Sequence, residues 1–178
     1  MAATPLNSFH VATARFFLYD RYFFVTVCSL KTRRRLHDPD FQRLAFALAR
    51  MRRKRGFLLR AWVLLPDHWH AIIYPPFSRV FRAAKVCSTI AINVRLAEAG
   101  DLWQERFFDR ALRTVKEYHN QVEYIHFNPV PRGLVKRPEE WEWSSLHEYA
   151  GLSGEEQERQ CGLRIDRVRL PEDENTRI

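Results

Sequence analysis

The stretch FLLRAWVLLPDHWHAIIY, residues 57–74, decides the fold that this sequence predicts. Its first half, residues 57–65, is a mostly apolar run with the length and composition of a buried β-strand. Pro66 and Asp67 supply turn chemistry. Residues 68–74 then predict a second strand that returns beside the first.

Two histidines stand in the second of these strands. Residues two apart in a strand point to the same face, so we expect His68 and His70 side by side and Trp69 on the other face. The pair could chelate one metal ion, or it could be one core histidine and one surface histidine. A zinc hydrolase is a further alternative, but the remaining histidines lack the spacing of a zinc cluster, at His10, His37, His119, His126 and His147.

The segments around residues 57–74 predict an α+β fold. Further strands are expected at residues 21–29 and 105–109, and helices at residues 38–55, 78–99 and 114–128. Asp38 or Asp40 can cap the first helix. The order β-α-β-β-α-β with another helix predicts a ferredoxin-like (split β-α-β) antiparallel sheet with helices on one face and an extra C-terminal helix.

Composition predicts a soluble cytoplasmic protein with a polyanionic partner. The 178 residues carry a net charge of +8, which favours nucleic acid before a membrane surface. Three cysteines without a CxxC pattern indicate a reducing compartment, and we expect neither a signal peptide nor a membrane span. One domain is expected over residues 1–150. Residues 151–178, with seven acidic and five basic side chains, are expected to be a mobile tail or to add an edge strand.

The predicted helix 114–128 separates two tyrosines. Helical spacing groups four residues into a core stripe, namely Val115, Tyr118, Val122 and Ile125. Tyr124 falls nearly opposite that stripe, on a polar face with Asn128 one turn away. Tyr124 is then either a half-exposed surface aromatic or a nucleophile, and a phenol needs an activated target, such as a phosphate polarised by a metal ion.

The ordered motifs resemble those of a known family. HWH (68–70) matches the HUH motif of single-tyrosine transposases, in which U is a hydrophobic residue. GDLWQERFFDRALR (100–113), YIHFNPVPRGLV (124–135) and RPEEWEWSS (137–145) resemble the signature of the REP-associated tyrosine transposases. The likeness runs from about residue 15 to residue 150. It is looser over the first thirty residues, which the family uses to recognise a guide sequence.

The resemblance implies an active site. Tyr124 would be the nucleophile, and His68 and His70 would bind Mg²⁺ or Mn²⁺, with Asn128 in the place of a third ligand. On ligand type, two imidazoles and an amide oxygen suit manganese somewhat better. The Trp141–Trp143 segment is expected to support packing, and His126 is not expected to be a ligand.

The resemblance also implies a reaction and a substrate. Tyr124 would attack a phosphodiester of single-stranded, hairpin-forming palindromic DNA and leave a 5′-phosphotyrosine and a free 3′-hydroxyl. Candidate DNA contacts are Arg82, Lys85, Asn93, Arg95, Trp103, Arg106 and Arg110. The sequence leaves open a monomer or a homodimer, and it leaves as the main alternative a non-catalytic module that binds palindromes.

Overall fold

The computed structural model describes residues 21–74 and 78–149 of the chain. Along these residues the elements follow the predicted order β-α-β-β-α-β with a further helix. Their bounds are β1 (Phe23–Cys28), α1 (Asp38–Arg55), β2 (Leu58–Leu64), β3 (His68–Tyr74), α2 (Ser78–Leu96), β4 (Phe108–Ala111), α3 (Val115–Phe127), η1 (Pro138–Glu140) and α4 (Leu146–Tyr149).

The four strands form one antiparallel sheet in the order β2-β3-β1-β4. This is the order of the predicted ferredoxin-like fold. β2 and β3 form the predicted hairpin, closed by a hydrogen bond from the Leu65 amide to the His68 carbonyl oxygen (2.9 Å). The amide and hydroxyl of Ser29 both donate to the carbonyl oxygen of Asp67 (2.8 and 3.0 Å). The end of β1 therefore holds the turn of the hairpin in place.

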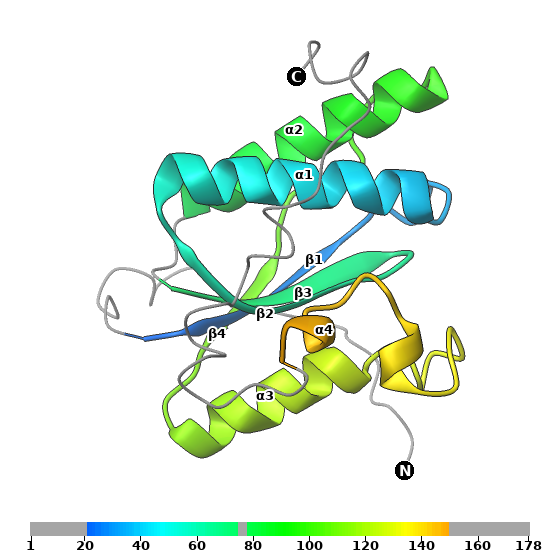
Figure 1. The fold of residues 1–178 in the computed structure, drawn as a ribbon. Helices are drawn as coiled ribbons and strands as arrows, with labels where there is room; N and C mark the ends of the chain where they lie inside the picture. Colours follow the sequence, from blue (N-terminus) through cyan, green and yellow to red (C-terminus); the bar gives the residue numbers. More distant parts are fainter. Residues whose placement is uncertain (1–20, 75–77, 150–178) are drawn as a thin grey trace.

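Helices cover both faces of the sheet (Figure 1). The predicted pair, α1 and α2, packs together on one face, and α3 lies on the other (Figure 1). The larger core lies under α1 and α2 and contains Phe41, Leu44, Leu48 and Trp69. A smaller core under α3 contains Ile72 and Ile125. The extra helix thus gives the sheet a second buried face.

Two details of the helices differ from the predictions. Neither Asp38 nor Asp40 is the N-cap of α1, because His37 takes that position and Asp40 stands three residues later. There a carboxylate oxygen of Asp40 accepts a hydrogen bond from the His37 amide (3.1 Å). α2 ends at Leu96 and not at the predicted residue 99. The next residue, Ala97, has a φ of 52°, which turns the backbone out of the helix.

The core stripe predicted for α3 is wrong at Val115. Thr114 caps the helix by accepting a hydrogen bond from the Glu117 amide (3.1 Å). Val115 is nevertheless 73% exposed, because it is the first residue of α3 and borders an open cavity. Ile125, nearly three turns further on, is fully buried.

The Trp-rich segment supports packing, as predicted. The indole of Trp141 donates to the Leu64 carbonyl oxygen, and the indole of Trp143 donates to Asp38 (both 2.9 Å). Backbone hydrogen bonds from Leu64 to Trp143 and from Ser145 to Trp62 (both 2.9 Å) attach this segment to the outer edge of β2.

Residues 1–20 and 150–178 lie outside the described residues. The division into a domain over residues 1–150 and a charged tail, and the looser match at the N-terminus, therefore stay predictions. In the part of the chain that the structure describes, every helix is too short or too polar to cross a membrane.

Asp40 provides a test of the packing of α1 against α2. Its buried carboxylate accepts hydrogen bonds from Arg95 of α2 (2.5 Å) and from Arg34 (2.8 and 3.0 Å). Burial raises the pKa of Asp40, but these bonds and the His37 amide outweigh it and lower the pKa.

We expect Asp40→Asn to reduce the free energy of unfolding by about 2 kcal/mol at neutral pH, less than for a fully buried pair because both arginines are partly exposed. The difference should begin to shrink as the pH falls below about 4, the value of an unfolded aspartate, and should vanish only below the lowered pKa of the folded carboxylate. Urea denaturation at neutral and acid pH measures the free energy of unfolding of both proteins. Glu140→Gln, which removes a charge from an exposed ion pair, is the control and should leave this free energy unchanged. Equal stability of Asp40→Asn and wild type at pH 7 would contradict the assignment.

Candidate active site

The two histidines lie on the central strand and face each other. In β3, His68 pairs with Cys28 and His70 with Thr26 of β1. Both histidines are buried, and Trp69 lies in the core on the opposite face, as predicted. The Nε2 atoms of His68 and His70 are 3.0 Å apart. The two Nε2 atoms therefore converge on one point beneath α3, and each can offer a lone pair there when its Nδ1 carries the ring proton.

The outer nitrogens of this pair have their own partners. Nδ1 of His68 lies 2.6 Å from a carboxylate oxygen of Asp67, and Nδ1 of His70 lies 2.8 Å from the hydroxyl of Thr26. The hydrogen bond to His68 lowers the pKa of Asp67 to about 2 against its partial burial, so the carboxylate is ionised. Partners of this kind fix the orientation of a metal-binding imidazole.

Burial keeps His70 neutral. It lowers the pKa of His70 well below the ordinary value, and the neighbouring His68 and the charge of Arg132 lower it further. A neutral imidazole offers a lone pair to a metal ion, whereas a charged one does not. His70 is therefore ready to act as a ligand at neutral pH.

Tyr124 lies against the histidine pair. The ring centroid of Tyr124 is 5.4 Å from that of His70 and 5.9 Å from that of Phe24, with edge-on geometry in both cases. The side chain is 47% exposed. The sequence places Tyr124 opposite the core stripe of α3, but in the structure its ring leans onto the sheet while part of it stays open to solvent. The tyrosine and His70 are thus brought together from elements 54 positions apart along the chain.

Asn128 ends α3 and is bound to a residue that the sequence did not single out. Asn128 is buried, and its side-chain oxygen accepts a hydrogen bond from Nε of Arg132 (2.7 Å). Nη1 of Arg132 lies 3.8 Å from Asp67. An arginine in the motif PRG gives no periodic signal, so only the fold brings it into this network.

The donor set fits a divalent metal ion. Two ligand nitrogens that form a right angle at one ion, each about 2.1 Å from it, lie about 3.0 Å apart. The Nε2 atoms of His68 and His70 have this separation. The Asn128 oxygen has a second lone pair beside the one that Arg132 uses. Within residues 21–74 and 78–149, no three His, Cys, Asp or Glu side chains gather into a metal cluster, and Asn128 stays the predicted third ligand.

Known proteins were compared with the chain by sequence and by structure. The chain matches no family model. A REP-associated tyrosine transposase from Escherichia coli is 34% identical over 138 residues, which cover 75% of this chain and 81% of the relative. The chain belongs to the REP-associated tyrosine transposases. It is therefore a DNA-processing enzyme, a tyrosine transposase.

Two further comparisons agree with the family. A candidate member from Haemophilus influenzae is 29% identical over 100 residues, 47% of this chain and 56% of the relative. A solved structure of a REP-associated tyrosine transposase bound to a REP hairpin has a TM-score of 0.71 and 32% identity, and the match covers 81% of this chain and 88% of that one. The fold of the transposase is thus shared over most of both chains.

Four of the seven candidate DNA contacts of the transposase already have partners within the fold. Lys85 donates to the carbonyl oxygens of Gln104 and Glu105, and Arg95 is paired with Asp40. Asn93 bonds to Arg33 and to the Gly100 carbonyl oxygen, and the indole of buried Trp103 donates to Ser88 (2.9 Å). The contacts of Lys85, Trp103 and Gly100 hold the loop between α2 and β4, and the pair of Arg95 with Asp40 holds α2 against α1. Arg82, Arg106 and Arg110 are exposed, and contact with DNA stays a prediction for all seven.

His126 lies apart from the paired histidines. It is buried, and its Nε2 is 2.8 Å from the hydroxyl of Ser145. Burial lowers its pKa to about 4, and the nearby His147 lowers it further. The contact with Ser145 ties α3 to the Trp-rich segment, and the role of His126 in this structure is packing.

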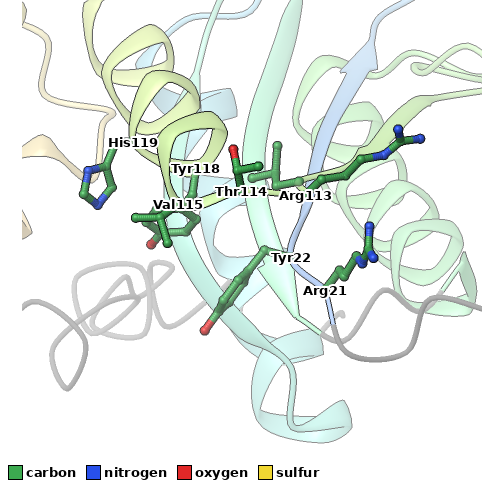
Figure 2. Close-up of a pocket in the computed structure, with 8 residues that line it drawn as sticks. Arg21, Tyr22, Arg113, Thr114, Val115, Tyr118 and His119 are labelled. Atoms are coloured by element: carbon green, nitrogen blue, oxygen red, sulfur yellow. The ribbon is translucent and has the colours of Figure 1, made fainter.

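An open cavity lies at the other end of α3. It has a volume of about 430 Å³ and is lined by the start of the helix, the residues that join it to β4, and the two residues just before β1 (Figure 2). Val115, Tyr118 and Tyr22 lie in its wall. It contains none of the residues predicted for the active site.

Among the candidate DNA contacts, Trp103 lies in the core and Arg106 lies at the surface, and substitution of each tests this difference. We expect Trp103→Ala to reduce the free energy of unfolding by about 3–5 kcal/mol, because a fully packed indole is lost. Arg106→Ala should change it by less than about 0.5 kcal/mol, because the side chain is exposed. Urea denaturation of both variants measures this, and a stable Trp103→Ala protein would show that the ring is not needed for the core.

Proposed function

We propose that this transposase cleaves and rejoins single-stranded, hairpin-forming palindromic DNA through a 5′-phosphotyrosine on Tyr124. The observation that carries the proposal is the contact of Tyr124 with His70, whose Nε2 faces that of His68. The related transposase of known structure is bound to a REP hairpin, and this supports a hairpin as the substrate here.

His68, His70 and the oxygen of Asn128 would hold a divalent ion, Mg²⁺ or Mn²⁺. Bound there, the ion would polarise a non-bridging oxygen of the scissile phosphate. Asp67 and Thr26 keep the two rings oriented through their Nδ1 atoms. Phe24 supports the ring of Tyr124 from below, so that its exposed part faces the DNA.

The reaction is a transesterification. The phenol oxygen of Tyr124 forms a bond to phosphorus as it loses its proton to solvent, and the bond from phosphorus to the 3′-oxygen breaks. The departing 3′-oxygen takes up a proton and becomes a hydroxyl. The phosphotyrosyl bond keeps the energy of the original diester, so a DNA 3′-hydroxyl can reverse the step without ATP. Positioning by α3 is the main contribution of the chain.

A covalent adduct tests the proposal. The protein is incubated with Mn²⁺ and a set of labelled single-stranded hairpins with imperfect palindromic stems, and the products are separated on a denaturing gel. We expect an adduct with wild type and none with Tyr124→Phe. Tyr118→Phe is the matched control on the same helix. Tyr118 contacts Tyr22 and lies away from the paired histidines, His68 and His70. It should form the adduct at close to the wild-type rate.

The other outcomes identify the competing functions. Binding of the hairpins without an adduct would indicate a non-catalytic palindrome-binding module. Cleavage that survives in Tyr124→Phe would indicate a metal hydrolase that uses water in place of the tyrosine.

Metal binding can be measured without DNA. Isothermal titration with Mn²⁺ should show one site in wild type and none in His70→Ala. Asp67→Asn should weaken binding by about 10- to 100-fold, because the oriented carboxylate on His68 is lost. Asp101→Asn, at an exposed aspartate of the loop before β4, is the control. Unchanged Mn²⁺ affinity in His70→Ala would exclude this site.

A further inference from the structure

Arg132 is joined to both halves of the active site. It follows α3 by five residues, and its Nε donates to the oxygen of Asn128 (2.7 Å). Its Nη1 lies 3.8 Å from the carboxylate of Asp67, which is itself 2.6 Å from His68. The guanidinium therefore stands between the end of the helix that carries the tyrosine and the support of one histidine.

Much of this guanidinium remains available. Arginine has five N–H donors in a planar fork. Asn128 takes the one on Nε, and the contact of Nη1 with Asp67 is too long for a strong hydrogen bond. Among the contacts that the structure describes, Nη2 has none, and the side chain is 37% exposed. A fixed cation with free donors thus faces solvent beside the paired histidines.

The chemistry needs a cation at this place. A phosphodiester carries one negative charge and gains more as the tyrosine oxygen attacks, and protein donors aimed at that charge lower the barrier. Two other basic candidates, Lys85 and Arg95, are bonded to backbone and to Asp40. A guanidinium also matches the two non-bridging oxygens of a phosphate, which a point charge does not.

We propose that Arg132 contacts the scissile phosphate and neutralises the charge that develops there, an inference that rests on the function proposed above. Arg132 forms no covalent bond and moves no proton. The hydrogen bond to buried Asn128 fixes the side chain of Arg132. The side chain of Arg137, by contrast, is 74% exposed at the surface. The residue becomes a second electrophilic group next to the metal ligands.

A cycle of binding measurements tests the contact. Wild-type protein first maps the scissile phosphate through its adduct. Affinity is then measured without added metal ion, in the Tyr124→Phe background, for the same hairpin with either a normal phosphate or a neutral methylphosphonate at that position. With Arg132 present, the neutral group should weaken binding about tenfold, and in Arg132→Gln by less than about twofold. The slope of log affinity against log salt should also fall by about 0.7 in Arg132→Gln.

Controls separate this contact from a role in folding. Arg137→Gln should keep the full tenfold effect of the neutral group, and Arg132→Lys should keep the salt slope because it keeps the charge. In the Tyr124 protein, Arg132→Gln should slow adduct formation by about 100-fold or more. A purely structural role would weaken both DNAs equally and leave the salt slope unchanged.

The inference would be overturned if the two changes were additive. In that case, replacing the phosphate by methylphosphonate would lower the binding affinity by the same factor with arginine, lysine or glutamine at position 132. If the wild-type adduct forms and the cycle is additive, only the role of Arg132 fails. If no adduct forms with any hairpin, the proposed function fails and this inference fails with it.

Discussion

The pairing of β3 with a neighbour on each side is the constraint on which the rest of the structure depends. β1 and β2 both bond to β3, so the side-chain alternation of HWH is fixed by two ladders. A slip of one residue would exchange the two faces and bury His68 and His70 under α1 and α2. The turn of the hairpin is held by Ser29, which adds a third restraint on the register.

The sequence predicts the sheet well because its information is local. The alternation in residues 68–74 places His68 and His70 on one face, and the bounds predicted for α1 are those observed. The approach of Tyr124 to His70 could not be derived in this way, since a helical wheel gives angles around one axis and not how the helix lies on a sheet. The misplacement of Val115 has the same cause.

Charge is the part of the site that the sequence describes least well. A net charge of +8 predicts a polyanionic partner, but several basic residues hold the fold together. Arg34 and Arg95 are paired with Asp40, and Arg33 with Glu98. The importance of a cation depends on what stands beside it, which is why Arg132 became visible only through Asn128 and Asp67.

The attachment of residues 143–145 to β2 affects more than packing. It occupies backbone groups of Trp62 and Leu64 at one margin of the sheet. The opposite margin is β4, four residues long, with Arg110 projecting into solvent. A short charged margin is a poor template for a strand from another molecule. The sheets of two copies of the chain are therefore poorly suited to join edge to edge into aggregates.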